Sequence, residues 1–253
     1  MKKNNSLIIK PYLNFLIIIS ILIVLFEFIL PSNNYFPKPS VVIQSYPSLF
    51  NDYNLLINFS STFGIVYLSL MIGIILSKVL SVLLLEKKCV NSLVKKRNKC
   101  FWFILLAPLL ILPLIWFPDF YLFKMIYALL ISTIAFTIKR IIEMEKIDKN
   151  YISSIRSLGL PINIIRNKIM TKLVEPAVIA YARDYQFILW LLVLIYEVLI
   201  QREGIGIMIK RIVEYRDLSG AIAILFILGF IIILTNIILS KLNEKLSYKN
   251  VYE

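Results

Sequence analysis

The sequence predicts an all-α polytopic membrane protein with six transmembrane helices. Of its 253 residues, 59% are hydrophobic, and the mean hydropathy is +0.81. Six apolar stretches are long enough to cross a hydrocarbon core of about 30 Å, and a chain in lipid satisfies its backbone hydrogen bonds most simply as a helix. The predicted spans cover residues 12–30, 59–85, 101–117, 120–138, 177–200 and 218–240.

The first three spans differ in what flanks or interrupts them. The stretch 12–30 is longer than the apolar core of a usual secretory signal, and no small-residue cleavage pattern follows it, so we expect it to be retained. The next loop, 31–54, contains FPKPS, whose two prolines predict an extended turn. In the third span, Pro108 and Pro113 predict a kink that either lines a pore or adjusts the packing between helices.

Lys and Arg are concentrated in alternate loops. The N-terminal segment, the loop 86–100, the segment 139–176 and the C-terminal tail hold 20 of the 28, whereas the loops 31–54 and 201–217 hold five. Loops rich in Lys and Arg stay cytoplasmic, so both termini are predicted to be cytoplasmic. This asymmetry and anionic lipid headgroups account for the net charge of +13, and no nucleic-acid partner is expected.

Residue types that commonly carry chemistry are scarce. The chain has no His, only seven Gly and no nucleotide-binding fingerprint, and its two cysteines, Cys89 and Cys100, lie in or beside a predicted cytoplasmic loop. Thiols in that compartment are normally reduced. We therefore expect no metal, no cofactor, no catalytic residue and no enzymatic activity.

The fifth span carries a stripe of residues spaced by seven: Pro176, Arg183, Trp190 and Glu197. An ideal helix drifts by only about 20° per heptad, so the four residues lie on one slowly turning face. A charge inside a membrane is costly, which makes Arg183, Trp190 and Glu197 candidates for a translocation pathway or a permease interface. In the alternative interpretation, Arg183, beside Asp184, and Glu197 extend from the two helix ends toward water.

A polar, basic segment separates the fourth and fifth spans. It covers residues 151–176, YISSIRSLGLPINIIRNKIMTKLVEP, and is predicted to form helix. Gly159 predicts a helix end or a close backbone approach, and Pro161 with Asn163 predicts the start of a new helix. We expect a cytoplasmic partner to dock there; alternatively, the segment is a basic helix that lies on anionic lipid.

Over about residues 35–245 the chain resembles the permease subunits of bacterial ATP-binding cassette importers, in the branch that includes nitrate, sulfonate, taurine and bicarbonate systems. The family has a Glu-Ala-Ala triplet in this cytoplasmic loop, where the present chain has Ser153-Ser154-Ile155. The Leu-Pro pair that ends the family pattern is replaced by Thr171-Lys172. The residues that match in type and spacing are Gly159, Ile169, Pro176, Arg183, Trp190, Glu197, Gly204, Gly206, Asp217, Ala221 and Gly229, together with FPKPS, Gly73, Pro108 and Pro113.

The resemblance implies a single permease domain, 1–253, in a bacterial plasma membrane, with a coupling loop at about 140–176. A coupling helix between the fourth and fifth spans would bind cytoplasmic ATP-binding subunits, which carry ATP and Mg. Its implied contact residues are Ser153, Ser154, Ile155, Arg156, Ser157, Leu158, Gly159, Leu160 and Pro161. A second permease copy, identical or related, and an extracytoplasmic substrate-binding protein would complete the importer.

Other functions for a chain of this composition are a secondary carrier or a membrane scaffold. A membrane-embedded transferase is less favoured, because such enzymes usually place clustered Asp, Glu or His at the membrane face.

Overall fold

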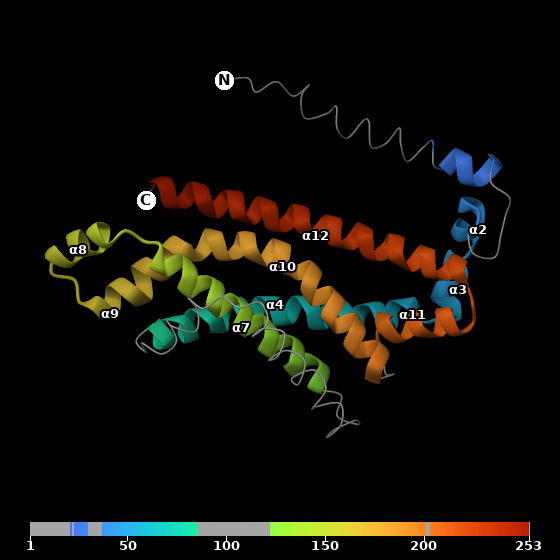
Figure 1. Ribbon diagram of the computed structural model, residues 1–253, viewed down its shortest axis with the longest axis horizontal. Helices are drawn as coiled ribbons and strands as arrows, with labels where there is room; N and C mark the ends of the chain where they lie inside the picture. Colours follow the sequence, from blue (N-terminus) through green and yellow to red (C-terminus); the bar gives the residue numbers. More distant parts are fainter. Residues whose placement is uncertain (1–20, 22, 30–36, 86–121, 201–202, 253) are drawn as a thin grey trace. The chain divides into compact units, whose positions relative to one another are not determined.

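The computed structural model describes residues 21, 23–29, 37–85, 122–200 and 203–252 (Figure 1). These residues form helices and short connections, with no strand among them, which confirms the predicted all-α class for this part of the chain. The helices are η1 (Leu25–Ile29), α2 (Pro39–Gln44), α3 (Tyr46–Asn51), α4 (Leu55–Leu85), α7 (Phe123–Glu145), α8 (Lys149–Ser157), α9 (Ile162–Ile164), η2 (Ile165–Met170), α10 (Thr171–Ile200), α11 (Ile205–Glu214) and α12 (Leu218–Tyr252).

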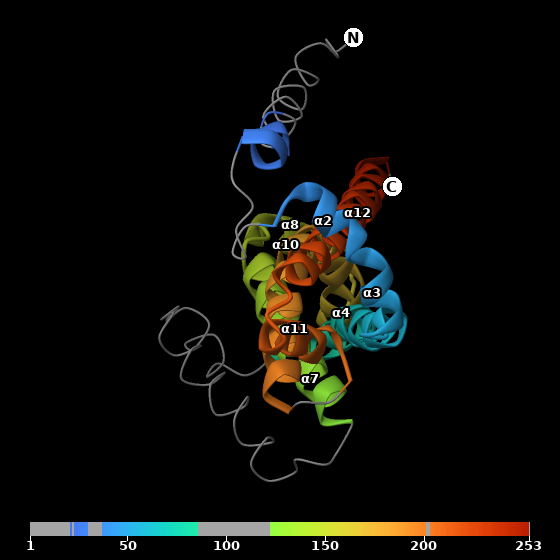
Figure 2. The same ribbon diagram turned by 90° about the vertical axis from the view of Figure 1, so that its right-hand side faces the viewer.

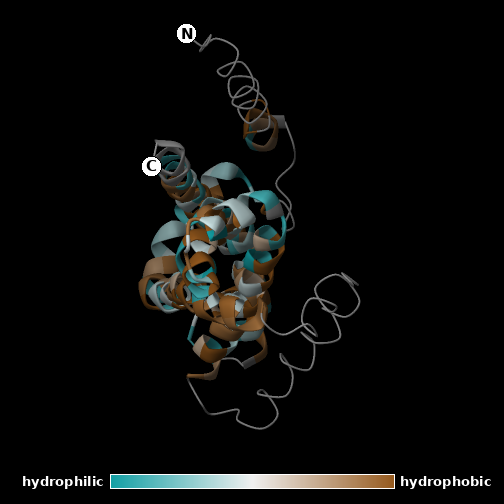
Figure 3. Cartoon of the chain, turned by 90° about the vertical axis from the view of Figure 1, so that its left-hand side faces the viewer, coloured by the Kyte–Doolittle hydropathy of each residue, from teal (hydrophilic) through white to brown (hydrophobic). Residues whose placement is uncertain are grey.

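Four stretches of helix in the described residues are long and apolar enough to cross a membrane: Leu55–Leu85, Phe123–Glu145, Ile162–Leu199 and Leu218–Lys245. They correspond to the second, fourth, fifth and sixth predicted spans. Figure 3, coloured by hydropathy, shows hydrophobic residues over much of the described helices. The first predicted span is described only in part, and the third, with Pro108 and Pro113, lies outside the described residues. The chain therefore has the helices of a membrane protein, four of which match the prediction.

The chain divides into two compact units. One comprises residues 1–56 and 208–228, and the other comprises residues 57–207 and 229–253. In the first unit, the extended backbone predicted for FPKPS is present at Lys38, but the expectation that its second proline disfavours helix is wrong, because α2 begins at Pro39 and α3 follows at once. Lys38 has the extended conformation of a helix N-cap, and the fixed φ of a proline suits the first helical position.

Acidic side chains accept hydrogen bonds at the starts of α2 and α12 in the first unit. Ser40, in the first turn of α2, donates from its backbone N and its Oγ to Glu27, at 3.1 and 2.9 Å. Asp217 precedes α12 and accepts from the backbone N of Gly220 at 2.9 Å, which satisfies an N–H group at the helix start.

In the second unit, α4 and α7 run parallel and meet through small side chains. Residues of α4 contact residues 63 positions later in α7 at three successive places: Ser61 with Lys124, Ser69 with Ser132, and Ser77 with Arg140. Between these contacts, a Cβ added to Gly73 would lie 2.7 Å from Ser132 Oγ. The small residues of α4 at these positions, with Ser132 of α7, let the two helix backbones approach closely, as in many membrane helix pairs.

The helices α7 and α10 run antiparallel and lie side by side (Figures 1 and 2). Lys124, near the start of α7, contacts Glu197, near the end of α10, and in the middle the rings of Phe136 and Tyr185 lie 5.4 Å apart. Both helices extend beyond the predicted spans, because α7 continues to Glu145 and α10 follows α9 and η2 without a break. Hydropathy predicts only the apolar part of a helix. Ion pairs between residues four positions apart, such as Lys139 with Glu143 at 2.8 Å, stabilise the helix beyond that part.

Candidate functional site

The predicted coupling segment begins with α8, whose two ends have recognisable caps. Asp148 is the N-cap and accepts from the backbone N of Asn150 at 2.9 Å. At the other end, Gly159 has a φ of +82° and donates from its backbone N to Arg156 at 3.0 Å. A left-handed glycine at this place is a common helix stop, so the predicted helix end at Gly159 is confirmed.

A new helix starts two residues later. Pro161 is the N-cap of α9, which begins at Ile162, so the predicted restart at Pro161 and Asn163 is also confirmed. From there α9, η2 and α10 form one continuous helical stretch, and η2 is a π-helical turn within it. The segment 148–161 is thus a short capped helix and a turn, inserted between two long apolar helices.

One side of α8 is anchored to the second unit. Ile152 and Ile155 pack against a buried apolar cluster formed by Met144, Ile165, Met170 and Val174. The remaining predicted coupling residues are exposed: Ser153, Ser154, Arg156, Ser157, Leu158, Gly159, Leu160 and Pro161. Leu158, which follows the last residue of α8, is 78% exposed. The segment therefore has an exposed, mostly polar surface that includes the apolar side chain of Leu158, and Ile152 and Ile155 attach it to the second unit.

Ser153, at the position where similar permeases have Glu, bonds to its own helix. Its Oγ donates to the backbone O of Asn150 at 2.8 Å, and Ser154 Oγ donates to the same oxygen at 2.9 Å. Neither hydroxyl can form the charged contact that a glutamate would offer. Arg156 is the basic residue in the last turn of α8, and it is exposed.

The three stripe residues of α10 lie in different surroundings and are not brought together. The side chain of Arg183 is 41% exposed, and its Nε donates to Asp184 at 3.1 Å. Trp190 is buried, and its Nε1 donates to the hydroxyl of Tyr67 on α4 at 3.3 Å. The side chain of Glu197 is completely buried. Arg183 is therefore partly exposed, whereas Glu197 is enclosed by protein.

Glu197 is the centre of a buried polar cluster that joins α4, α7 and α10. Its Oε1 accepts from Lys124 Nζ at 2.7 Å and from Thr62 Oγ1 at 2.8 Å. Lys124 also donates to Ser61 Oγ at 3.1 Å and to the backbone O of Glu203 at 3.0 Å. All three protons of the ammonium group therefore have an acceptor.

The connection after α10 completes this cluster through three successive backbone N–H groups. The N of Gly204 donates to Asn58 Oδ1 at 2.9 Å, the N of Ile205 to Thr62 Oγ1 at 2.9 Å, and the N of Gly206 to Glu197 Oε2 at 2.8 Å. A carboxylate at the start of a helix, here α11, is favoured by the helix dipole. The segment 204–206 is thus held by side chains rather than by other backbone groups.

Glycine is required at both ends of the segment 204–206. Gly204 has a φ of +142°, and a Cβ added there would lie within 2.5 Å of three atoms of the Glu197 carboxylate. A Cβ at Gly206 would lie 2.4 Å from the backbone O of Leu194. The absence of side chains lets the backbone reach the carboxylate.

Because the charges of Lys124 and Glu197 are paired and hydrogen-bonded, the cluster is suited to holding helices together. A buried ion pair is tolerated in a protein interior when further hydrogen bonds satisfy its charged groups, and here the ammonium group donates three hydrogen bonds and the carboxylate accepts three. Among the described residues no group of three or more His, Cys, Asp or Glu side chains is placed to hold a metal.

Glu197 was predictable from the sequence as a candidate residue, but its partners Lys124, Thr62 and Asn58 were not predicted. One signal in the sequence points to Lys124, since consecutive spans run in opposite directions and a cation at the start of the fourth lies at the same membrane face as an anion at the end of the fifth. Arg140, which the charge pattern places in the cytoplasmic loop, is completely buried. Comparison of the chain with protein-family models, curated proteins and solved structures finds no match.

Proposed function

We propose that this chain is the transmembrane permease subunit of an ATP-binding cassette importer. It forms part of the substrate pathway and receives force from cytoplasmic ATP-binding subunits through the segment 148–161. The proposal extends to a bacterial plasma membrane with both termini cytoplasmic, a second permease copy and an extracytoplasmic substrate-binding protein. ATP and Mg belong to the ATP-binding partner.

The observation that carries the proposal is the form of α8. It is a capped helix with an exposed polar surface, seated by Ile152 and Ile155 between the ends of α7 and α10. A short helix that is rigidly attached to two long apolar helices can transmit a push from a soluble partner to both. The exposed Leu158 offers such a partner an apolar contact at the tip.

The buried cluster around Glu197 supports the mechanical part of the proposal. The ion pair joins the end of α10 to the start of α7, at the opposite end of these helices from α8. Alternating access by rigid bodies requires helices that move together rather than bend independently. An ion pair that joins α7 and α10 at one end, and a docking helix at the other end, would favour such a joint movement.

The proposal is tested by purifying the tagged full-length chain in mild detergent from its native membrane and identifying the bound proteins by mass spectrometry. We expect stoichiometric recovery of an ATP-binding subunit, and a second permease if the transporter is a heterodimer. Recovery of the chain alone, also after crosslinking, would contradict the proposal and favour a scaffold or a secondary carrier.

A further inference from the structure

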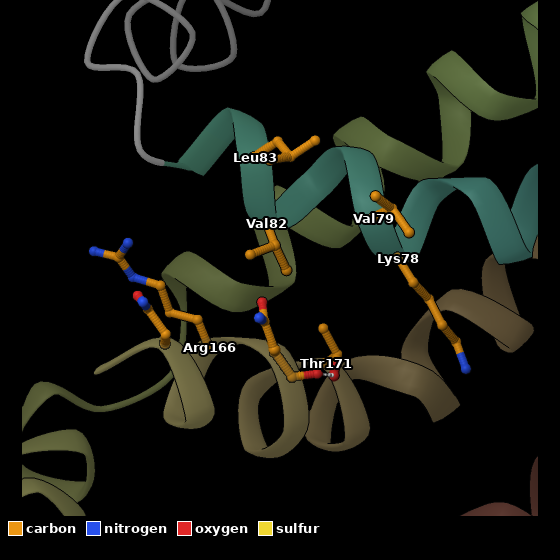
Figure 4. A pocket seen from close by; sticks show the side chains of 8 residues that line it. Lys78, Val79, Val82, Leu83, Arg166 and Thr171 are labelled. Carbon is orange, nitrogen blue, oxygen red and sulfur yellow. Dashed lines mark hydrogen bonds between the residues drawn. The ribbon is translucent and has the colours of Figure 1, made fainter. Parts of the chain in front are cut away.

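A groove in the second unit lies between the end of α4 and the helical stretch that leads into α10 (Figure 4). Its volume is about 400 Å³. One wall consists of Val79, Val82 and Leu83 from α4, and the other of Asn163, Arg166 and Asn167. One side of the groove is therefore apolar and the other is polar and cationic.

The groove lies near one end of a candidate membrane span. Its apolar wall is in the last two turns of α4, which ends at Leu85. Its polar wall precedes and includes η2, where the π-helical turn widens the backbone. Side chains near the end of a membrane span lie at the boundary between hydrocarbon and headgroups. The apolar wall suits the acyl chain of a phospholipid, and the polar wall suits its headgroup.

The charges around the groove favour an anion. Arg166 lies in the polar wall, and Lys78, at the edge, forms an ion pair with Glu175. Arg140 lies behind the groove, with its Nη1 donating to the backbone O of Thr171 at 3.3 Å and its Nε to Ser77 Oγ at 3.4 Å. Three cations and one carboxylate thus surround this site.

Arg140 adds a buried positive charge that is only partly balanced, because Glu175 interacts with both Arg140 and Lys78. The residue is completely buried, and its Nη2 has no hydrogen-bond partner in the part of the chain that the structure describes. Burying a charge is costly, and a nearby bound anion lowers that cost. Basic pockets between membrane helices on the cytoplasmic side commonly hold anionic lipid headgroups.

We propose that this groove binds a glycerophospholipid with an anionic headgroup. The phosphate lies against Arg166 and the amide of Asn167, and an acyl chain lies along Val79 and Val82. The lipid screens the charge of Arg140 and fills the space beside η2. This site depends only on α4 lying in a membrane, and not on the proposed importer function.

The test is a titration of the detergent-purified full-length chain with phosphatidylglycerol or phosphatidylcholine, followed by native mass spectrometry. We expect tighter binding of phosphatidylglycerol, and a loss of about fivefold in its affinity on Arg166→Gln, the effect of one basic residue near an anionic lipid. Lys168→Gln is the matched control, because Lys168 is an exposed cation on the same helix that does not line the groove. Its affinity should stay within about twofold of the unmodified chain.

A second variant, Val82→Trp, keeps every charge and fills the apolar side of the groove. It tests lipid binding at the groove independently, in case Arg166→Gln does not fold. It should weaken phosphatidylglycerol binding while the chain remains monodisperse. Equal binding of the two lipids, equal effects of Arg166→Gln and Lys168→Gln, or unchanged binding in Val82→Trp would overturn the proposal. Displacement of the lipid by inorganic phosphate would also overturn it, and would assign the groove to a soluble anion.

Discussion

Lys124 and Glu197 are 73 residues apart in the sequence and form an ion pair of 2.7 Å, in which both side chains are almost completely buried. The pair joins the start of α7 to the end of α10. Thr62 and the backbone of Gly206 bind the same carboxylate, so α4 and the start of α11 share the contact. Four segments of the second unit thus meet at one carboxyl group.

Removing one charge of this pair should destabilise the chain more than removing both. Lys124→Met leaves a buried carboxylate without its cation, and we expect the free energy of unfolding to fall by about 3–5 kcal/mol. Glu197→Gln in the same chain should restore part of the loss, because glutamine leaves no buried charge and its one oxygen can accept from Gly206, while Thr62 can donate to the backbone O of Asn58, at 3.1 Å. Reversible unfolding in mixed micelles measures the double-mutant cycle. Additive effects of the two substitutions would contradict the described pairing.

Gly206→Ala should displace the segment 204–206 from Glu197. The new Cβ would lie 2.4 Å from the backbone O of Leu194, so either the helix or the segment has to shift. We expect a loss of about 1–3 kcal/mol in the free energy of unfolding, as for other overpacked sites.

Gly229→Ala is the matched control, because its Cβ would have no atom within 4 Å. It lies inside α12, where alanine favours helix over glycine by about 0.5–1 kcal/mol. A stable Gly206→Ala protein would show that the segment is not packed as described.

Gly73→Val should separate α4 from α7. Its side chain would collide with Ser132, whose Oγ lies 2.7 Å from the position of a Cβ. We expect a fall in the melting temperature in detergent and weaker crosslinking between cysteines introduced at positions 69 and 132. Gly64→Val in the same helix is the control, since its Cβ would meet no atom within 4 Å. If both variants melt at the same temperature, close packing at Gly73 is refuted.

If the proposed function holds, Gly159→Arg should abolish both association with the proposed ATP-binding subunit and transport, while membrane insertion stays normal. A Cβ at this position meets no atom within 4 Å, so the fold tolerates it apart from about 1–2 kcal/mol of left-handed strain. The bulky cation would project from the exposed turn beside Leu158, where the partner is proposed to dock.

The control is Gly159→Asn, because asparagine adopts the left-handed conformation more readily than other residues and adds no charge. Co-purification and uptake should survive in this variant. Normal uptake by the Gly159→Arg protein would contradict the docking hypothesis. It would not bear on the proposed lipid site in the groove beside η2.

Local signals in the sequence predicted local structure well. Gly159 and Pro161 act through their own backbone preferences, so the end of α8 and the start of α9 were predictable without knowledge of their neighbours. The apolar stretches likewise predicted four described membrane helices. Pro39 shows the limit of such signals, since proline is compatible with both an extended turn and a first helical position.

Contacts between helices were harder to predict. The seven-residue spacing placed Glu197 on a stripe, but its partner Lys124 depends on α7 and α10 being neighbours. The register of α4 against α7 rests on serines and Gly73, which occur in many helices without such a role. Arg140 was assigned to a loop because positive charge predicts a cytoplasmic position but says nothing of burial. These contacts follow from packing between distant segments, which no single stretch of sequence encodes.

The way in which residues 204–206 are held has a consequence for how this end of the molecule opens. Their three N–H groups bind Asn58, Thr62 and Glu197, and two of these acceptors contact each other. Lifting any one residue therefore strains the bonds of the others and uncovers part of a buried ion pair. We therefore expect the segment to open as a unit rather than one residue at a time. Amide protons at these positions should then exchange with solvent together, at one common rate.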